Sequence, residues 1–368
     1  RSVELDDLLG RDPVNLDWEA MGQMIQNRRV LITGGAGSIG SELCRQVARL
    51  EPEEITLFEQ NEFSLYSLAM ELEEQFPDVQ FRRLLGDVCD PEAVQFVFSQ
   101  YRPEVVFHAA AYKHVPMLQA QLRETIRNNT VGTMVTARAA VECGVQKFIL
   151  ISTDKAVNPT SMMGVSKRLA EMVAQLNNAK SPTAFITVRF GNVLGSAGSV
   201  VPLFERQIRA GGPVTVTDPM MTRYFMTISE ACQLILQACA IGRGGEIFVL
   251  NMGEPVKIDY LARQMIRLSG KLPEEEIEIR YTGLRPGEKL TEELFHPDED
   301  LAPTSYDKIL LAQSRSFDET HLESELETLR RSVELYDHEQ ARHIAIGLVP
   351  EYREVQESST PESPDQAA

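Results

Sequence analysis

A glycine-rich turn between an apolar segment and a helix is the feature that most constrains how this chain can fold. Residues 30–33 read as a buried β-strand, and glycines follow at positions 34, 37 and 40. Such glycines allow a tight turn, let the backbone approach a pyrophosphate, and let the helix pack closely on the strand. The helix N-terminus also stabilises anionic phosphates. The pattern predicts a dinucleotide site made by Gly34, Gly37, Ser38, Ile39 and Gly40.

The first half of the chain repeats the order strand, helix, strand. Buried strands are expected over residues 30–33, 55–58, 79–84, 105–107, 148–151 and 184–190, and helices over 41–50, 65–75, 91–99, 123–143 and 163–177. Alternation of this kind predicts an α/β fold, a doubly wound parallel Rossmann sheet with right-handed crossovers.

Four segments follow from this rhythm. Residues 29–190 are predicted to form the dinucleotide-binding domain, and residues 191–348, where Gly and Pro are frequent, mainly a smaller substrate-binding lobe. Residues 1–28 read as an acidic lead-in with a helix candidate over 18–25. Residues 349–368 contain a low-complexity segment and are expected to be a disordered tail.

The composition excludes several kinds of partner. A net charge of −18 argues against non-specific nucleic-acid binding, which requires a basic face. No run approaches the roughly 20 apolar residues of a membrane helix. The five cysteines lack paired or ligand spacing and the six histidines are scattered, which predicts buried thiols, a reducing compartment and no metal site. This pattern predicts a location in the cytoplasm or at the cytoplasmic face of a membrane. Because the chain starts at Arg1 without Met, we interpret it as a piece of a longer protein.

Three further positions bear on the cofactor. Glu59 ends the second strand, 19 residues after Gly40, where a carboxylate would bind the adenosine ribose hydroxyls. A 2′-phosphate there would meet a like charge with no Arg nearby in the sequence, so NAD is predicted over NADP; the alternative for Glu59 is a solvated strand-end charge. Asp87-Val88 looks like the adenine contact of the short-chain dehydrogenases, and the small residues Ala109 and Ala110 leave room for the nicotinamide.

The segment that should carry the chemistry lacks one expected residue. Short-chain dehydrogenases place a Tyr four residues before a Lys on one helix, as the acid/base group. Here the Lys is Lys167, and Met163 occupies the earlier position. A thioether neither gives nor takes a proton. Either the site is inactive, or Thr153, Asp154 and Lys155 at the end of the preceding strand do this work.

Five blocks give the chain a specific resemblance. They are residues 109–116, 152–159, 188–196, 222–227 and 284–289. In this order they resemble the extended short-chain dehydrogenases, and within them the UDP-N-acetylglucosamine 4,6-dehydratases of bacterial glycan synthesis. The larger members of that group carry a membrane region before the catalytic domain. The resemblance also implies that members with Met at the position of Met163 retain the configuration at C5, whereas members with Tyr invert it.

The resemblance implies roles for the chemical residues. Dehydration oxidises the sugar C4, removes the C5 proton, expels the C6 hydroxyl as water and returns the hydride to C6. Thr153 would hydrogen-bond the C4 oxygen, and Asp154 would be the acid at C6, which requires a raised pKa. Lys155 would be the base at C5, with a pKa lowered by desolvation and by Lys167. Lys167 would bind the nicotinamide ribose. The C4 proton would leave by Thr153, a water or a neighbouring amine.

The other blocks are expected to hold the UDP-sugar. Asn192, Ser199 and Val200 would lie near the diphosphate and the sugar, and Arg285 would pair with a phosphate. Glu288 would accept hydrogen bonds from the uridine ribose. The remaining candidates are Thr215 and Arg223 in the nucleotide pocket, and Lys113 and His114 near the sugar or diphosphate, with a structural role left open for His114.

Two other functions stay open from the sequence. A UDP-sugar C4-epimerase would need no acid at C6, and a non-catalytic NAD-binding regulator would explain the missing Tyr. By analogy with the superfamily, we expect a homodimer or higher homo-oligomer that pairs through the helices at 123–143 and 163–177.

Overall fold

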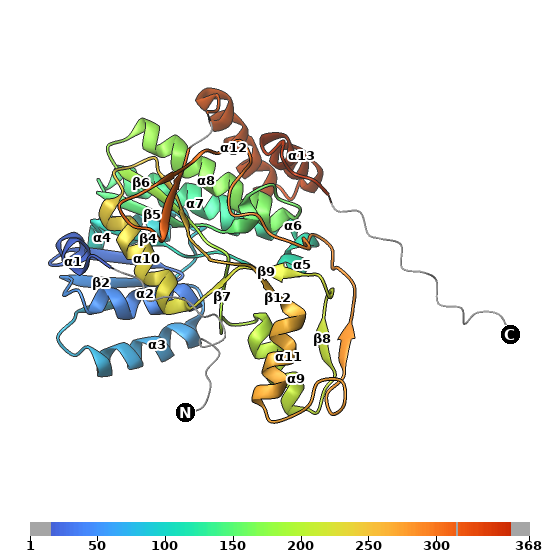
Figure 1. Cartoon of the computed structure of the whole chain (residues 1–368). Coiled ribbons are helices and arrows are strands. Elements are labelled where there is room, and N and C mark those ends of the chain that lie inside the picture. The colour runs from blue at the N-terminus through green and yellow to red at the C-terminus, as the bar shows by residue number, and fades with distance from the viewer. Residues whose placement is uncertain (1–15, 314–315, 355–368) are drawn as a thin grey trace.

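The computed structural model describes residues 16–313 and 316–354, and its central feature is a nine-stranded sheet (Figure 1). Seven of these strands run parallel. The two that come last in the chain, residues 301–303 and 309–312, are antiparallel to their neighbours in the sheet. In spatial order the strands are β14 (Leu301–Pro303), β15 (Ile309–Ala312), β11 (Ile247–Leu250), β6 (Ala184–Arg189), β5 (Lys147–Ile151), β4 (Val105–His108), β1 (Arg29–Thr33), β2 (Glu54–Glu59) and β3 (Phe81–Leu85).

Helices cover both faces of this sheet, which is why its central strands are apolar and buried along almost their whole length. One face carries α1 (Trp18–Ile25), α2 (Ser38–Ala48), α3 (Glu62–Gln75) and α10 (Ile228–Ile241). The other carries α4 (Pro91–Tyr101), α6 (Leu122–Ile126), α7 (Gly132–Glu142) and α8 (Met162–Lys180), with α12 (Glu319–Glu334) and α13 (His338–Leu348) packed beyond them. The predicted doubly wound α/β fold is confirmed.

The strand order reverses beside β1. The chain passes from β1 to β2 and β3 on one side, and then returns to β4 on the other side of β1. Thr33, the last residue of β1, pairs with Phe58 on β2 and with His108 on β4. The carboxyl ends of parallel strands at such a reversal leave a crevice, where ligands bind in folds of this type.

A smaller lobe projects from the carboxyl end of the sheet (Figure 1). Its apolar cluster includes Phe204, Val214, Ile266 and Ile279. Its elements are β8 (Val214–Val216), β9 (Thr222–Arg223), β12 (Val256–Lys257), β13 (Ile279–Tyr281), α9 (Val200–Arg209) and α11 (Ile258–Leu268). Other short elements are β7 (Asn192–Val193) and β10 (Phe225–Met226), which pair with each other, and the helix α5 (Val115–Gln119).

The expected boundary at residue 191 is not a boundary of the sheet. β11, β14 and β15 all come after it and extend the sheet beside β6. Helices α10, α12 and α13 likewise pack on the sheet layers and not in the smaller lobe. The chain therefore returns to the large domain after building the lobe.

The single helix expected over 123–143 contains a π-turn. Residues Arg127–Val131 adopt this wider turn between α6 and α7. The turn holds Asn129, whose side chain donates to Ser166 on α8 and to the carbonyl of Tyr112. The wider turn thus places Asn129 where it can bind partners on two other segments of the chain.

The first residues of the tail expected over 349–368 are packed on the protein. Val349 is fully buried, Tyr352 is nearly so, and the Arg353 N–H donates to the Pro159 carbonyl. Residues 355–368 lie outside the described part of the chain, as do residues 1–15 of the lead-in. The helix expected over 18–25 is α1, with Met21 and Ile25 buried.

Helix α8 is buried along most of its length. Every residue of α8 from Met162 to Leu176 is buried within one chain. The helices α5, α6, α7 and α13 of the same chain pack against it. The outer side of α8 is therefore already covered within one chain, and the homodimer expected through the helices at 123–143 and 163–177 stays a prediction.

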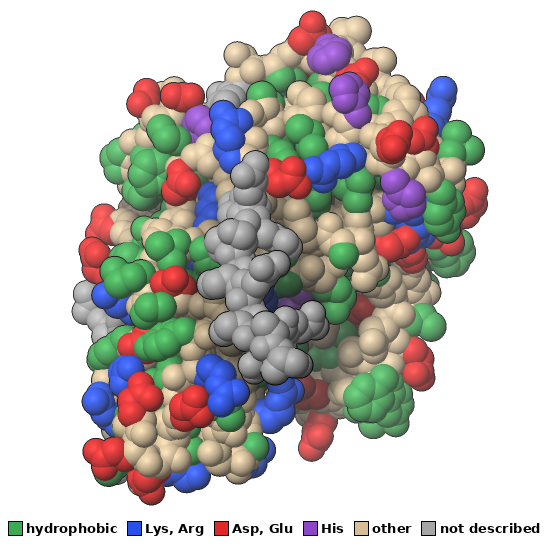
Figure 2. Space-filling model, turned by 90° about the vertical axis from the view of Figure 1, so that its right-hand side faces the viewer, with side chains coloured by type: hydrophobic (Ala, Val, Ile, Leu, Met, Phe, Trp, Pro, Cys, Tyr) green, Lys and Arg blue, Asp and Glu red, His purple; other side chains and the backbone are tan. Residues whose placement is uncertain are grey.

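Acidic and basic side chains are interspersed over the face shown in Figure 2. Within residues 16–313 and 316–354, no helix has both the length and the apolar character of a membrane-spanning segment.

Candidate active site

A cavity of about 1250 Å³ opens at the carboxyl ends of the parallel strands. The segments that follow β1, β4, β5 and β6 line one side of it. The smaller lobe and the loop at 282–289 line the other side. Pockets for one small ligand usually measure about 300–1,000 Å³, so this cavity has room for two ligands side by side.

The glycine turn forms a cradle with no space for side chains. A Cβ on Gly40 would lie 2.2 Å from the Gly34 carbonyl oxygen, and one on Gly34 would lie 2.7 Å from the Ala110 backbone. Gly34 also has a φ of +63°, which favours glycine. Helix α2 begins here, and Gly37 caps it without a side-chain hydrogen bond. Its first N–H groups therefore suit a pyrophosphate.

Glu59 lies at a second, adjoining cavity of about 610 Å³. Its carboxylate accepts hydrogen bonds from the N–H groups of Ala36, Gln60 and Asn61, which hold it at the end of β2. Arg45 lines the same cavity, although it is remote from Glu59 in the sequence and was not predicted. Its guanidinium is engaged by Glu71 and Glu42.

Of the predicted cofactor residues that follow β3 and β4, one lines the main cavity and three do not. Ala109 lines the main cavity, whereas Ala110 packs behind it against Gly34. Asp87 lines neither described cavity; it accepts from the Cys89 N–H and pairs with Arg127 at 2.9 Å. Val88 is buried beneath Gly132.

Thr153, Asp154 and Lys155 follow β5 and form one hydrogen-bonded group. The Thr153 hydroxyl donates to Asp154 Oδ1 at 2.8 Å, and Lys155 Nζ donates to the same oxygen at 2.9 Å. Thr153 and Lys155 line the cavity, whereas Asp154 lies behind them with 0% exposure. A Cβ on the cavity-lining Gly191 would lie 3.2 Å from Asp154 Oδ2, which has no partner among the described residues. That oxygen therefore lies beside a cavity-lining residue without a side chain.

The predicted low pKa of Lys155 is wrong. Burial acts to lower this pKa, but the carboxylates of Asp154 and Glu292 outweigh it and raise the value. Lys155 is therefore an ammonium in the resting protein, and it must lose a proton before it can act as a base.

Met163 and Lys167 lie where the sequence placed them, on α8 at the cavity wall. Met163 packs against Val115 and Leu118 and presents no proton-transfer group. Lys167 Nζ donates to the Ile151 carbonyl at 2.6 Å, and burial lowers its pKa to about 8.

Asn192 and the N-terminus of α9 line the same cavity. Asn192 accepts from Lys155 Nζ at 3.2 Å. Ser199 caps α9 without a hydrogen bond from its side chain, and its buried hydroxyl has no partner within the described residues. Val200, the first residue of α9, also lines the cavity. An anionic group fits at this helix end.

Lys113 and His114 come from the loop after β4 and line the cavity. Burial lowers the pKa of both, and Lys113 further lowers that of His114. His114 lies against Gly198, where a Cβ would be 2.5 Å from its ring. The glycine is needed to admit the imidazole.

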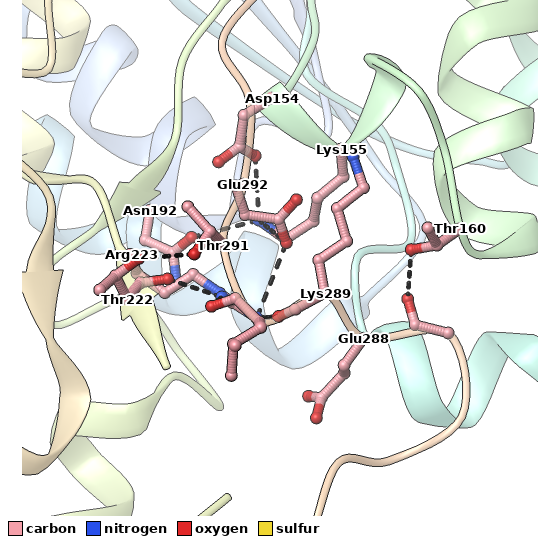
Figure 3. Close-up of polar contacts among 12 residues, drawn as sticks. Asp154, Lys155, Thr160, Asn192, Thr222, Arg223, Glu288, Lys289, Thr291 and Glu292 are labelled. Carbon is pink, nitrogen blue, oxygen red and sulfur yellow. Dashed lines mark hydrogen bonds and ion pairs between the residues drawn. The ribbon is translucent and has the colours of Figure 1, made fainter. Parts of the chain in front are cut away.

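The remaining candidates come from the smaller lobe and its neighbouring loop. Arg285 pairs with Glu288 at 2.6 Å, and the Arg285 side chain is 58% exposed. Thr215 accepts from Gln207 at 2.7 Å. Arg223 donates to the carbonyls of Thr222, Lys289 and Leu290, so it also holds this loop against the site (Figure 3).

Sequence reasoning missed Glu292. This carboxylate is only 5% exposed, lines the cavity and faces Lys155 (Figure 3). It lies three residues beyond the last recognised block, and no spacing rule links it to Lys155, which is 137 positions earlier. Only the tertiary structure brings the two together.

Known proteins resemble the chain over most of its described length. A family model described as "Polysaccharide biosynthesis protein" matches residues 30–314. The capsular polysaccharide biosynthesis protein CapD of Staphylococcus aureus is 50% identical over 331 residues, which are 89% of this chain and 55% of CapD. The chain thus spans about half the length of this relative. A UDP-glucose 4-epimerase of Rickettsia bellii is 35% identical over 75% of this chain and 80% of the epimerase.

Solved structures share the fold. Pen from Bacillus thuringiensis superposes with a TM-score of 0.71 at 32% identity, over 80% of this chain and 90% of Pen. DesIV, a dTDP-glucose 4,6-dehydratase of Streptomyces venezuelae with NAD and TYD bound, superposes with a TM-score of 0.63 at 22% identity, over 72% of this chain and 88% of DesIV. The second likeness, at this identity, concerns the fold alone.

Proposed function

Because this chain belongs to the polysaccharide biosynthesis protein family, we propose that it is an NAD-dependent 4,6-dehydratase of UDP-N-acetylglucosamine. The observation that carries the proposal is the group formed by Thr153, Asp154 and Lys155 in the cavity that also contains the glycine cradle. A dehydratase needs both an acid and a base beside the oxidised carbon, and this group offers a carboxyl and an amine.

The residues present fit NAD. Gly34, Gly37 and Gly40 leave room for the pyrophosphate at the start of α2, and Glu59 would bind the adenosine ribose. Arg45 is already engaged by two carboxylates, so we propose NAD over NADP. The bound cofactor supplies a site that takes the hydride of C4 and returns it to C6. Lys167 would bind the nicotinamide ribose, as in the superfamily the chain resembles.

The C4 proton has a route that avoids the missing Tyr. Thr153 lines the cavity and donates to Asp154, so a proton that enters at the Thr153 hydroxyl leaves at Asp154 Oδ1. The resulting carboxylic acid is then the group that protonates the C6 hydroxyl as water departs. One proton thus travels from C4 to the leaving water, and this accounts for both roles of Asp154.

Lys155 is the base that removes the C5 proton. Because the same amine returns a proton after C6 has been reduced, both transfers occur on one face of the sugar and the configuration at C5 is retained. Met163 supplies no proton to the opposite face. Retention follows from the presence of a single acid/base group at C5.

The other cavity residues hold the UDP portion. We assign the diphosphate to the N-terminus of α9, with Ser199, Val200 and Asn192, and to Arg285. Glu288 would release Arg285 and accept from the uridine ribose. Lys113, His114, Thr215 and Arg223 complete the pocket wall.

Nuclear magnetic resonance of the reaction in deuterated water tests this proposal. The protein should convert UDP-N-acetylglucosamine to a 4-keto-6-deoxy sugar with deuterium at C5, without added reductant or oxidant. The similarity to UDP-glucose 4-epimerase favours a second candidate, C4-epimerisation, which would give UDP-N-acetylgalactosamine with the C6 hydroxyl intact. A protein that binds NAD and the sugar but changes neither carbon would be a regulator.

A further inference from the structure

Glu292 is a buried carboxylate that has no role in the dehydratase mechanism proposed for the other cavity residues. One oxygen, Oε1, lies 3.8 Å from Lys155 Nζ and 3.7 Å from Arg223 (Figure 3). The other, Oε2, is buried and has no hydrogen-bond partner among the described residues. Buried carboxylates normally satisfy both oxygens, so an unsatisfied oxygen at a cavity wall requires an explanation.

The surroundings of Glu292 favour its accepting a proton from Lys155. Burial raises its pKa, and the negative charge of Asp154 raises it further, while Lys155, Arg223 and Lys289 act in the opposite direction. The balance leaves a carboxyl that holds a proton more readily than an exposed Glu does. The Lys155 ammonium, 3.8 Å away, can supply this proton, whereas the Arg223 guanidinium at 3.7 Å does not lose one.

The proposed reaction creates a need for such an acceptor. Lys155 is an ammonium at rest, and it cannot remove the C5 proton until it has lost one of its own. Asp154 cannot take that proton, because it receives the proton of the C4 hydroxyl through Thr153. Two of the three Lys155 N–H groups point to Asp154 and Asn192, which leaves the third for Glu292.

We propose that Glu292 takes the Lys155 proton and thereby turns Lys155 into the base at C5. This inference rests on the proposed dehydratase function. Glu292 acts through Lys155, so it is a positioning residue that holds a proton and does not itself touch the reacting carbons.

The protons balance over the cycle. Oxidation at C4 places the hydroxyl proton on Asp154, and Lys155 passes one proton to Glu292. The C5–H bond then breaks, its proton goes to Lys155, its electrons form the C5–C6 double bond, and the C6 hydroxyl leaves with the Asp154 proton as water. After reduction at C6, Lys155 returns a proton to C5 and recovers its own from Glu292. All three side chains end as they began.

The test compares Glu292→Gln with Glu293→Gln. Glu293 is the next residue; its side chain is 45% exposed, does not line the cavity, and binds Asn158 and Lys289. Glu292→Gln should lower kcat by on the order of 10²-fold, the usual loss when acid/base assistance is removed. Because C4 oxidation precedes the blocked step, reduced nicotinamide and the 4-keto sugar should accumulate in a single turnover. Glu293→Gln should match the parent protein in both measurements.

The pH profile separates this role from a structural one. In the parent protein kcat should fall as the pH drops through the pKa of Glu292, because a protonated Glu292 accepts nothing. In Glu292→Gln the limb at the pKa of Glu292 should be replaced by one at higher pH, where the residual kcat rises by about tenfold per pH unit as Lys155 loses its proton to water. Glu292→Asp, which keeps a carboxylate, should restore part of the rate.

Several outcomes would overturn the proposal. The first is an unchanged kcat and pH profile in Glu292→Gln. The second is a Glu292→Gln protein that still binds NAD and UDP but loses activity without accumulating reduced nicotinamide. If Glu292→Gln does not fold, a parent kcat that stays flat from neutral pH down to the ordinary Glu pKa of about 4.3 decides against Glu292. If the parent protein performs no dehydration at all, the proposed function itself fails.

Discussion

At the scale of single residues, the proposed chemistry depends on two adjacent side chains, Asp154 as the acid and Lys155 as the base. Asp154 is enclosed by protein and Lys155 lines the cavity, yet one carboxylate oxygen joins them to Thr153. Removing the carboxyl charge with Asp154→Asn, or the amine with Lys155→Ala, should each lower kcat by ~10²–10⁴. NAD binding, followed by calorimetry, should survive in both variants because neither residue belongs to the glycine cradle.

Met163 provides the comparison for these variants. Met163→Ala should cost much less, because a thioether transfers no proton and only packing against Val115 and Leu118 is lost. Met163→Tyr should bring no large gain, since the C4 proton already leaves through Thr153. A hundredfold gain in kcat from Met163→Tyr, with Lys155→Ala still active, would contradict the assigned roles.

Arg285 tests the binding of the diphosphate. Arg285→Ala should raise KM for the UDP-sugar by ~10–100-fold, since a charge-assisted contact contributes about 1.5–3 kcal/mol. Arg280→Ala is the matched control, because Arg280 is exposed, pairs with Glu278 and does not line the cavity. Unchanged UDP affinity by calorimetry in Arg285→Ala would refute the phosphate role.

At the scale of secondary structure, the turn from β1 to α2 decides whether a dinucleotide can bind. Gly40→Ala would force a Cβ to within 2.2 Å of the Gly34 carbonyl oxygen, so the backbone must shift. The expected cost is ~1–3 kcal/mol in the free energy of unfolding, together with weaker NAD binding. Thermal melting with and without NAD measures both effects.

Gly22→Ala is the control for this variant. Gly22 lies within α1, and a Cβ there would meet nothing within 4 Å. This change should stabilise the protein by up to ~1 kcal/mol through helix propensity. Equal NAD affinity in Gly40→Ala and in the parent protein would show that the turn does not hold the pyrophosphate.

The sequence was sufficient for the elements that depend on local patterns. Buried apolar runs predicted β1, β2, β4, β5 and β6, and the glycine spacing predicted the turn, because strand burial and helix N-termini leave local signals. The π-turn at Arg127–Val131 was not predictable, since it depends on the partners of Asn129 on α8. The raised pKa of Lys155 and the position of Glu292 likewise depend on contacts between distant segments.

At the scale of the whole molecule, a buried ion network ties the sheet to the C-terminal segment. Glu171 on α8 receives Arg189 from β6 at 2.7 Å and Arg168 at 3.1 Å, while Arg189 also pairs with Glu299 and Arg168 with Glu351. Burial opposes the ionisation of Glu171, but Arg189, Arg168 and the Ser152 hydroxyl outweigh it and lower the pKa to about 2.

This network predicts how stability depends on pH. An unfolded Glu titrates near pH 4.3, so the contribution of Glu171 is fully present above that pH and is lost as the pH falls towards 2. Glu171→Gln should destabilise the protein by ~3–5 kcal/mol at neutral pH, because it breaks a buried pair. The variant should also lose less stability between pH 5 and about 2.5 than the parent protein does. Urea unfolding at several pH values checks this, and parallel pH curves for the two proteins would contradict it.

The path of the C4 hydrogen decides whether this chain is a 4,6-dehydratase. UDP-N-acetylglucosamine carrying deuterium at C4 should yield a 4-keto sugar whose deuterium lies in the new C6 methyl group, because NAD held in the glycine cradle would supply the hydride acceptor and donor within one active site. Methyl-group deuterium in nuclear magnetic resonance and mass spectra, obtained without added NAD, is the predicted result. Deuterium that remains at C4 of an epimerised sugar, or no turnover by protein that binds both ligands, would contradict the assignment as a 4,6-dehydratase.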